Sequence, residues 1–361
     1  MYQREGSLSS PPLIWEIVLT QGLLFGEQEV EGLLGGFTLP EKEKTPSPVK
    51  KKKIIVLSGP TSVGKTELSL QIAKSIGGEI VSADSMQVYR GMDIGTAKVP
   101  KTERDQVAHH LIDCRDLNQT FNVVDFFHEA QMAIQEIFQR DHTPIVVGGT
   151  GFYIHALLYG PPTGPPSVGP LRDKLEEEMK EVGPASLYAK LKELDPEYAK
   201  TISERDRQKI IRGLEIISLT SKKVSFFTKS IEDHHMHYDF RCWFIYFPKE
   251  IIYPRIEMRC DWMIAEGFLE EVIALKKQGL ENNLSASQAI GYRQCLEYLN
   301  SAKTEQDFEK FVFSFKQASR KYAKRQFTWF RKEPLFRWVN RNNVSTERIV
   351  EMIIQDMETS F

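Results

Sequence analysis

The sequence predicts an α/β fold, in which a parallel sheet core is interrupted by an all-helical insertion. Three observations predict it. A short apolar run leads into a glycine loop and an amphipathic helix, further apolar runs alternate with helical patterns, and a purely helical stretch separates two such groups. The chain has 361 residues, enough for a large core together with an inserted domain.

The first strand and helix enclose the most specific motif in the chain. The apolar run 54–57 predicts a buried strand, and Leu68, Ile72 and Ile76 recur at helical spacing. Between them stands G-x-x-x-x-G-K-T, the phosphate-binding loop, formed by Gly59, Pro60, Thr61, Ser62, Val63, Gly64, Lys65 and Thr66. Backbone N–H groups of such a loop surround phosphate oxygens, the lysine adds positive charge, and the threonine hydroxyl is placed to hold Mg²⁺.

Two polar residues follow later strands and are expected at the same edge of the sheet. Asp84 comes directly after the predicted strand 79–82, and Thr150 follows the buried run 143–149. Ligands of parallel sheets lie at the carboxyl ends of the strands, so Asp84 is either a site residue or an ordinary helix cap. The run 143–149 ends in glycines, whereas the corresponding strand of an ordinary ATPase usually ends in an aspartate. This difference weakens the interpretation of the chain as an ordinary ATPase.

The sequence divides into four parts. We expect residues 1–49 to form a disordered or loosely docked extension. Residues 50–160 are expected to form the first part of the core, with a helix near 125–140. Residues 161–234 predict the insertion, because a Pro/Gly-rich stretch precedes helical stripes at 171–182, 187–194 and 210–217. Residues 235–361 predict the second part, with a strand at 240–247 and C-terminal helices.

Composition excludes several classes of protein. The formal net charge is −2 and 27% of residues are charged, so any nucleic-acid site must be a local basic patch. The four cysteines are far apart, which predicts reduced thiols in a cytosolic protein. No apolar run approaches a membrane span.

The pair His109–His110 and the tract 234–237 predict structural hydrogen bonding and a solvated turn rather than metal sites.

The C-terminal region contains the predicted basic patch. Arg320, Lys324, Phe327 and Arg331 recur at helical spacing, with further aromatic residues (Tyr322, Trp329, Phe330, Trp338) interleaved. Basic residues alone are usually a solvated helix face. Aromatic side chains can stack on unpaired bases, so this combination makes RNA binding an equal alternative.

These motifs resemble the tRNA dimethylallyltransferase (tRNA isopentenyltransferase) family, from about residue 53 to 338. The resemblance rests on the phosphate-binding loop, the string 84–98 (DSMQVYRGMDIGTAK), 109–113 (HHLID), 148–150 (GGT), 289–293 (AIGYR) and 322–331 (YAKRQFTWFR). It implies a P-loop NTPase-like sheet core with a helical insertion domain. It also implies a cytoplasmic, monomeric enzyme. Eukaryotic members often carry a C-terminal zinc finger, and the absence of that pattern favours a bacterial-type enzyme.

The resemblance also implies the reaction and its residues. Such an enzyme transfers the dimethylallyl group from dimethylallyl diphosphate to the exocyclic amine of the adenosine 3′-adjacent to the anticodon, in tRNAs reading codons that begin with U. Asp84 would be the general base, Thr150 would contact the reacting region, and Arg259, in preference to Arg255, would contact the diphosphate. Mg²⁺ would bind at Thr66.

The tRNA-contacting segments that the resemblance implies are Asp84, Ser85, Met86 and Gln87; Gln208, Lys209, Ile210, Ile211 and Arg212; Gln288, Ala289, Ile290, Gly291, Tyr292 and Arg293; and Lys324, Arg325, Gln326, Phe327, Thr328, Trp329, Phe330 and Arg331. One departure stands out, because Lys209 replaces an arginine of the family pattern and loses its bidentate fork. Three alternatives stay open: a small-molecule kinase, a non-catalytic RNA-binding module and an enzyme that prenylates free adenine nucleotides.

Overall fold

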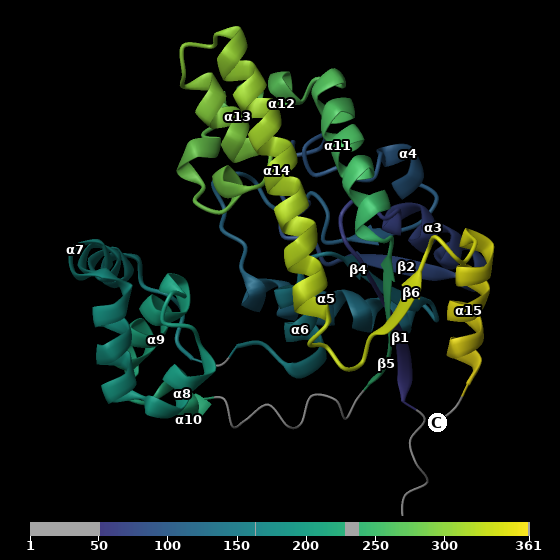
Figure 1. Ribbon diagram of the computed structural model, residues 1–361. Helices are drawn as coiled ribbons and strands as arrows, with labels where there is room; N and C mark the ends of the chain where they lie inside the picture. Colours follow the sequence, from purple (N-terminus) through teal and green to yellow (C-terminus); the bar gives the residue numbers. More distant parts are fainter. Residues whose placement is uncertain (1–50, 163, 228–237, 360–361) are drawn as a thin grey trace, which may run out of the picture. The chain divides into compact units, whose positions relative to one another are not determined.

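The computed structural model describes residues 51–162, 164–227 and 238–359 of the chain (Figure 1). The predicted N-terminal extension and the 234–237 histidine tract lie outside the described residues. Within the described ranges, no helix is both long enough and apolar enough to cross a membrane.

The described strands form one parallel sheet of six strands, in the order β3-β2-β4-β1-β5-β6. The bounds are β1 Lys52–Ser58, β2 Gly78–Ser82, β3 His109–His110, β4 Thr143–Gly148, β5 Tyr238–Tyr246 and β6 Arg337–Asn340. The strand predicted at 240–247 is β5, which pairs with β1 through seven residues in parallel register. The chain therefore returns to the centre of the sheet after the insertion, as the sequence predicts.

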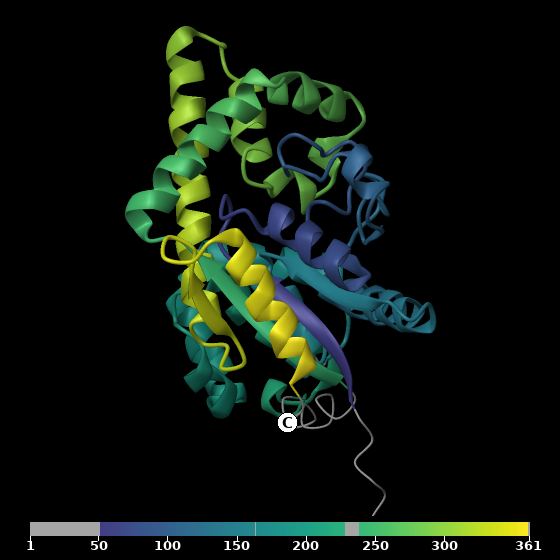
Figure 2. The same ribbon diagram turned by 90° about the vertical axis from the view of Figure 1, so that its right-hand side faces the viewer.

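Helices cover both faces of this sheet. Helices α3 (Lys65–Ile76) and α15 (Thr346–Glu358) pack on one face, and α5 (Val123–Gln139) and α6 (Gly151–Tyr159) on the other (Figures 1 and 2). Residues 54–57 of β1 are completely buried as a result. A central parallel strand is apolar on both faces, which is why its sequence shows a continuous apolar run instead of alternation.

A second group of helices stands beyond the carboxyl ends of the strands (Figure 1). It contains α11 (Lys249–Ala265), α12 (Phe268–Lys277), α13 (Tyr292–Leu299) and α14 (Glu305–Phe330), with short turns at α4 (Lys101–Arg104), η2 (Leu280–Asn282) and η3 (Ala286–Gln288). Helix α14 packs on α11 and α13, and it also reaches α6 beside the sheet. This long helix therefore connects the helical group to the sheet edge where the phosphate-binding loop lies.

The predicted insertion folds around a small core of its own. It consists of α7 (Gly169–Leu194), α8 (Pro196–Thr201), α9 (Arg207–Thr220) and α10 (Val224–Phe227), packed around Leu175, Met179, Leu187, Leu191, Ile210, Ile211 and Leu214. The two helical stripes predicted at 171–182 and 187–194 meet in α7 at Gly183, whose φ of 78° breaks the helix. The placement of Val182 and Leu194 on the apolar faces was wrong: they are 48% and 43% exposed. Each lies at the end of a helical segment, where spacing does not decide burial.

The neighbouring histidines of β3 make separate structural hydrogen bonds. The His109 Nδ1 atom lies 2.7 Å from the Val107 carbonyl oxygen, and His110 Nε2 lies 2.7 Å from Glu79 Oε2. Their side chains diverge because successive residues of a strand face opposite sides of the sheet.

Candidate active site

The phosphate-binding loop lies between β1 and α3, packed tightly against its neighbours. A Cβ atom at Gly59 would stand 2.3 Å from the Ile245 carbonyl oxygen, so only glycine allows the loop to pass β5 this closely. Gly64 has a φ of 89°, the left-handed conformation in which glycine is favoured, and it begins α3. The loop N–H groups and the N-terminus of α3 together form an anion-binding site.

Lys65 lies against this loop and close to other charged groups. Its Nζ donates to the carbonyl oxygens of Gly59 at 2.8 Å and Pro60 at 3.1 Å. Burial, together with the nearby Arg259 guanidinium, lowers the pKa of Lys65 to about 8, although the Asp84 carboxylate acts in the opposite direction. A lysine with this pKa is sensitive to any anion that arrives beside it, since an added negative charge restores the protonated form.

Asp84 serves both as a local cap and as a cavity residue, the two roles that its sequence position left open. Its Oδ1 accepts hydrogen bonds from the backbone N–H of Met86 at 2.9 Å and of Gln87 at 3.4 Å. Among the described residues, no hydrogen bond is recorded to Oδ2. The carboxylate is therefore oriented through one oxygen and keeps the other for a reacting group.

Thr150 joins the ends of β2 and β4 beside this carboxylate. Its Oγ1 accepts a hydrogen bond from the Ser85 backbone N–H at 3.2 Å, and its own N–H donates to the Ala83 carbonyl at 3.3 Å. The Gly148 Cα lies so close to Ala83 that a Cβ would meet the Ala83 carbonyl oxygen at 2.1 Å. Glycine at the last position of β4 is thus required for the close approach of the two strand ends.

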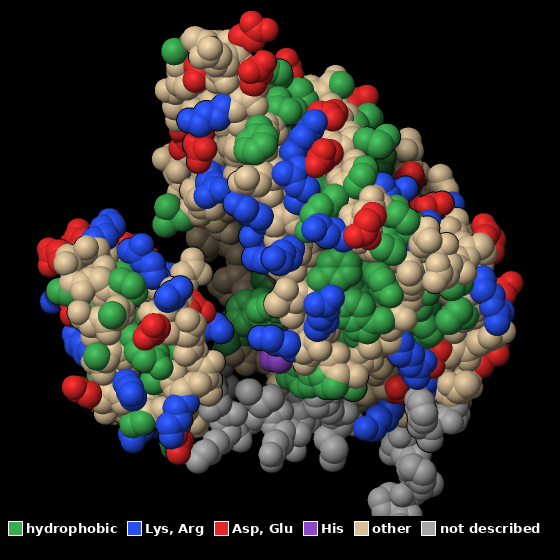
Figure 3. Space-filling view, viewed as in Figure 1, with side chains coloured by type: hydrophobic (Ala, Val, Ile, Leu, Met, Phe, Trp, Pro, Cys, Tyr) green, Lys and Arg blue, Asp and Glu red, His purple; other side chains and the backbone are tan. Residues whose placement is uncertain are grey.

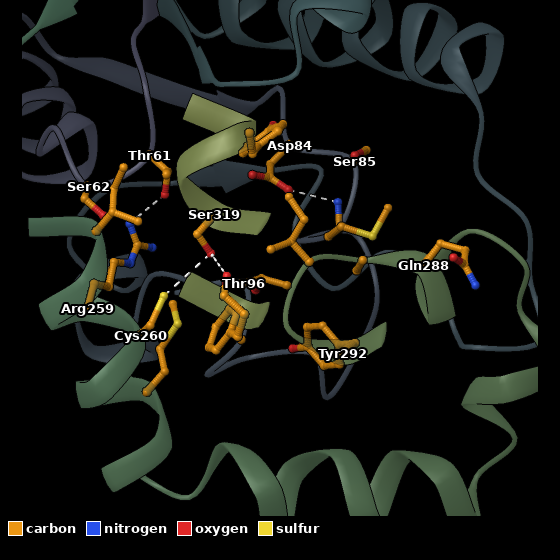
Figure 4. A pocket seen from close by; sticks show the side chains of 18 of the residues that line it. Thr61, Ser62, Asp84, Ser85, Thr96, Arg259, Cys260, Gln288, Tyr292 and Ser319 are labelled. Atoms are coloured by element: carbon orange, nitrogen blue, oxygen red, sulfur yellow. Dashed lines mark hydrogen bonds between the residues drawn. The ribbon is translucent and has the colours of Figure 1, made fainter. Parts of the chain in front are cut away.

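A cavity of about 250 Å³ opens beside these residues (Figure 4). Its polar end carries the loop residues Thr61 and Ser62 with Asp84 and Arg259. Its other walls combine apolar side chains with the polar side chains of Ser85, Thr96, Gln288, Ser319, Tyr322 and Arg325. The apolar lining comes mainly from α11, the turn between η3 and α13, α13 and α14, and includes Ile256, Met263, Ala289, Ile290, Tyr292 and Phe315. A cavity with a cationic, phosphate-binding end and an apolar end fits a ligand that is anionic at one end and hydrocarbon at the other.

The structure distinguishes the two candidate arginines. Arg259 lines the cavity and donates to Thr61 Oγ1 at 3.3 Å, and burial lowers its pKa. Arg255 is exposed and donates instead to the Ser62 carbonyl at 3.2 Å, on the outer side of the loop. One helical turn separates them, and only Arg259 is placed to contact a ligand inside the cavity.

A smaller neighbouring cavity provides oxygen donors that fit Mg²⁺. Lys65, Thr66 and Asp84 line it together, and Asp84 also lines the larger cavity. A hydroxyl, a carboxylate and the oxygens of a bound diphosphate are the hard ligands that Mg²⁺ prefers. The residues present therefore fit the ion that the loop motif implies.

Helix α14 contributes two polar side chains to the site, the buried Gln326 and the half-buried Tyr322. Gln326 accepts a hydrogen bond from the Thr61 N–H at 3.0 Å and donates one to the Gly149 carbonyl at 3.0 Å. Tyr322, one turn earlier, donates to the same carbonyl at 3.3 Å and lines the cavity. Tyr322 was predicted as a base-stacking residue and Gln326 as an RNA contact. Both instead hold the site, because this face of α14 packs on the sheet edge.

The predicted basic and aromatic stripe on α14 is only partly correct. Lys324 and Arg331 are exposed, but Arg320 forms an ion pair with Glu257. Phe327 packs against Phe244, Tyr246 and Trp338, whose ring centroids lie 5.7, 6.1 and 6.2 Å away. Phe330 is completely buried, whereas Trp329 remains 39% exposed. The apolar rings belong to the core because α14 closes the edge of the sheet.

The predicted tRNA-contacting segments contain the same mixture of exposed and buried side chains. Exposed members are Gln208, Lys209, Gln288, Arg293, Lys324, Arg325, Thr328, Trp329 and Arg331. Buried members are Ile210, Ile211, Ala289, Gly291, Tyr292, Gln326 and Phe330. Each segment is a run of consecutive residues on a helix or turn, so it includes residues that face solvent and residues that pack against the core. Figure 3 shows Lys and Arg side chains gathered over the region of α14.

Comparisons with known proteins agree with this geometry. Residues 87–333 match the family described as IPP transferase. A tRNA dimethylallyltransferase of Protochlamydia amoebophila is 53% identical, over 91% of this chain and 96% of that protein, and one of Chlamydia pneumoniae is 47% identical, over 85% and 90%. Among solved structures, the full-length tRNA isopentenylpyrophosphate transferase of Bacillus halodurans is 36% identical with a TM-score of 0.62, covering 85% of this chain and 96% of that one. A eukaryotic dimethylallyltransferase acting on tRNA is 27% identical with a TM-score of 0.70, covering 85% and 79%.

Proposed function

The chain belongs to the tRNA dimethylallyltransferase family, and from this premise we propose that it transfers a dimethylallyl group from dimethylallyl diphosphate to the exocyclic amine of the adenosine on the 3′ side of the anticodon. The tRNAs concerned are those reading codons that begin with U. The observation that carries the proposal is the single cavity in which the phosphate-binding loop, Asp84 and Arg259 meet an apolar wall.

The diphosphate end of the donor would bind at the loop. Leaving-group departure breaks the bond between the allylic carbon and the diphosphate oxygen, and negative charge grows on that oxygen. Loop N–H groups, Lys65 and Arg259 stabilise this charge, and they are already oriented before the donor arrives. The developing allylic cation would lie beside the apolar side chains of the cavity.

The adenine amine would attack from the side of Asp84. The amine is scarcely basic, and it gains a removable proton only as its nitrogen bonds to the allylic carbon. Asp84 Oδ2 then accepts that proton, while Oδ1 stays hydrogen-bonded to Met86 and keeps the carboxylate in place. Thr150 supports the same segment through Ser85.

Mg²⁺ completes this proposal, with Thr66 as its protein ligand. When bound, the ion would neutralise charge on the diphosphate oxygens. Thr66 lies in the first turn of α3 and lines the smaller cavity together with Asp84, which supports this placement. We also propose that the enzyme is cytoplasmic and acts as a monomer.

Recognition of tRNA would use the exposed cationic residues around the cavity mouth. Arg325 lines the cavity rim and lies over the Tyr322 ring at 5.5 Å, and Lys324 and Arg331 are exposed on the same helix. The target base must leave the stack to enter the cavity, which costs little in an anticodon loop. A free nucleotide would not need this cationic surface, and this favours tRNA over the nucleotide-prenylating alternative.

The test is transfer of radiolabelled dimethylallyl from its diphosphate to an anticodon stem-loop. A loop with guanosine in place of the target adenosine and free AMP are the controls. Label in the adenosine loop alone is expected. Label in AMP would assign the chain to nucleotide prenylation, and label in none of the three would contradict prenyl transfer.

A further inference from the structure

A hydrogen-bonded clamp beside the cavity centres on Glu271 of α12, whose side chain is half-buried. Its Oε2 accepts hydrogen bonds from the backbone N–H groups of Asp93 at 3.0 Å and Ile94 at 2.6 Å. Its Oε1 accepts one from the Gly95 N–H at 3.2 Å and one from the Tyr292 hydroxyl at 2.5 Å. Three successive backbone N–H groups around one carboxylate form an anion nest that an internal side chain occupies permanently.

This clamp presses the 93–95 loop onto aromatic rings. A Cβ atom at Gly95 would lie 2.3 Å from Phe268 Cε2 and 2.6 Å from Tyr292 Cε2, so the backbone rests directly on both rings. Phe268 in turn contacts Tyr292 and Phe315, with ring centroids 5.1 and 5.5 Å apart. All three rings are 2% exposed or less. Gly95, Thr96, Tyr292 and Phe315 line the cavity, so the clamped loop and the rings form one rigid wall.

The wall lies where the hydrocarbon of a prenyl donor would end. Figure 4 shows Thr61, Ser62 and Arg259 on one side of the cavity and Tyr292 at another. A donor whose diphosphate binds at the loop directs its hydrocarbon away from these cationic groups, toward the apolar lining. Burial, with the adjacent Glu271 carboxylate, raises the pKa of Tyr292 well above its usual value, so its hydroxyl remains a donor to Glu271.

We propose that Glu271 is a positioning residue which, through the 93–95 loop and Tyr292, fixes the depth of the cavity and so limits the donor to a five-carbon prenyl group. This rests on the proposed function and adds a determinant of donor length to it. Loss of the clamp frees three backbone N–H groups and the Tyr292 hydroxyl, and the wall can then yield to a longer chain. A rigid apolar wall discriminates only by size, so its effect on selectivity is moderate.

The test compares five-carbon and ten-carbon donors in competition. Dimethylallyl and geranyl diphosphate are supplied with one anticodon stem-loop, and the ratio of their kcat/KM values is measured together with the Tm. Glu271→Gln is expected to shift this ratio toward the ten-carbon donor by on the order of tenfold. Tyr292→Phe, which keeps the ring and the carboxylate, is expected to shift it less and in the same direction. Glu270→Gln removes the same charge from the exposed neighbouring position and is the matched control, with an unchanged ratio.

Three outcomes would overturn the proposal. The first is an unchanged ratio in Glu271→Gln while turnover and Tm fall, which would leave Glu271 a merely structural residue. The second is an equal shift in Glu270→Gln. The third outcome applies if Glu271→Gln does not fold, and it is an unchanged ratio of kcat/KM values in Tyr292→Phe. Assays of the unaltered protein separate this inference from the proposed function on which it rests. If the unaltered protein transfers neither prenyl group, the proposed function is overturned. If both clamp variants transfer the groups with unaltered selectivity, only the role of the clamp is overturned.

Discussion

Gln326 of α14 accepts a hydrogen bond from the backbone N–H of Thr61 at 3.0 Å, so the helix that carries Lys324 and Arg331 directly contacts the phosphate-binding loop. The same amide donates to the Gly149 carbonyl, next to Thr150. One buried side chain thus ties together the diphosphate site, the end of β4 and the helix proposed to bind RNA. The arrangement places donor binding and RNA binding on one rigid unit.

We expect Gln326→Met to weaken donor binding. Methionine fills a similar volume but leaves the Thr61 N–H without its partner and the Gly149 carbonyl with only the Tyr322 hydroxyl. Leaving a buried group unpaired costs about 1–3 kcal/mol. KM for dimethylallyl diphosphate should rise by roughly tenfold or more, since 1.4 kcal/mol corresponds to a factor of ten. Steady-state kinetics measures this, with Gln317→Met on the same helix as control. A KM equal to that of the control variant would show that the amide does not shape the loop.

The contacts of Gln326 could not be predicted from the sequence, unlike other parts of the site. The phosphate-binding loop could be predicted because strand, glycines, lysine and helix are consecutive, and Asp84 and Thr150 because parallel strands end at one edge. Gln326 and Glu271 could not be assigned, since their partners lie 265 and about 177 residues away along the chain. Periodicity placed Gln326 on a helix, but it does not say what packs against that helix.

The aromatic residues of α14 show the same limit. Phe327 and Phe330 alternate with Lys and Arg in a pattern equally typical of an RNA-binding face and of a helix covering a sheet edge. Only the position of β5 and β6 decides, because Phe244 and Trp338 supply the rings against which they pack. Helical spacing correctly identified exposed Lys324 and Arg331, whose charge keeps them outside the core.

Asp84→Asn should lower turnover and leave the fold unchanged. The asparagine Oδ1 can still accept from the Met86 N–H, so the capping hydrogen bond is kept while the second oxygen, the proposed proton acceptor, becomes an NH₂ donor. Loss of a general base reduces kcat by on the order of 10²-fold or more. Single-turnover transfer to a stem-loop measures this, and a binding assay with the same RNA is expected to show little change. Turnover close to that of the unaltered enzyme would remove Asp84 from the role of base.

Lys324→Ala combined with Arg331→Ala should weaken stem-loop binding and its dependence on salt. Both side chains are exposed, so little stability is lost. Each phosphate contact removed lowers the slope of log K against log salt by about 0.7–0.9. Binding isotherms at several salt concentrations measure the slope. Arg348→Ala on α15, where the arginine pairs with Glu351 at the surface, is the control and should keep the original slope. An unchanged slope in the double variant would place the RNA elsewhere.

The lowered pKa of Lys65 predicts how activity depends on pH. In the free enzyme this amine loses its proton as pH rises through about 8, and the neutral form no longer attracts the diphosphate. We therefore expect kcat/KM for the donor to fall above about pH 8. In the donor complex the diphosphate charge favours the protonated amine, so the fall in kcat should come at higher pH.

The same group affects folding stability with a definite sign. Its pKa is lower in the folded chain than the ordinary value of 10.5, so the unfolded chain binds more protons between about pH 8 and 10.5. Because stability rises with pH wherever the unfolded state binds more protons, Lys65 contributes a rise across this interval. Lys65→Met should remove both effects: the limb of kcat/KM near pH 8, at much reduced activity, and that contribution to the Tm. A kcat/KM profile that falls at the same pH in Lys65→Met would assign the titration to another group.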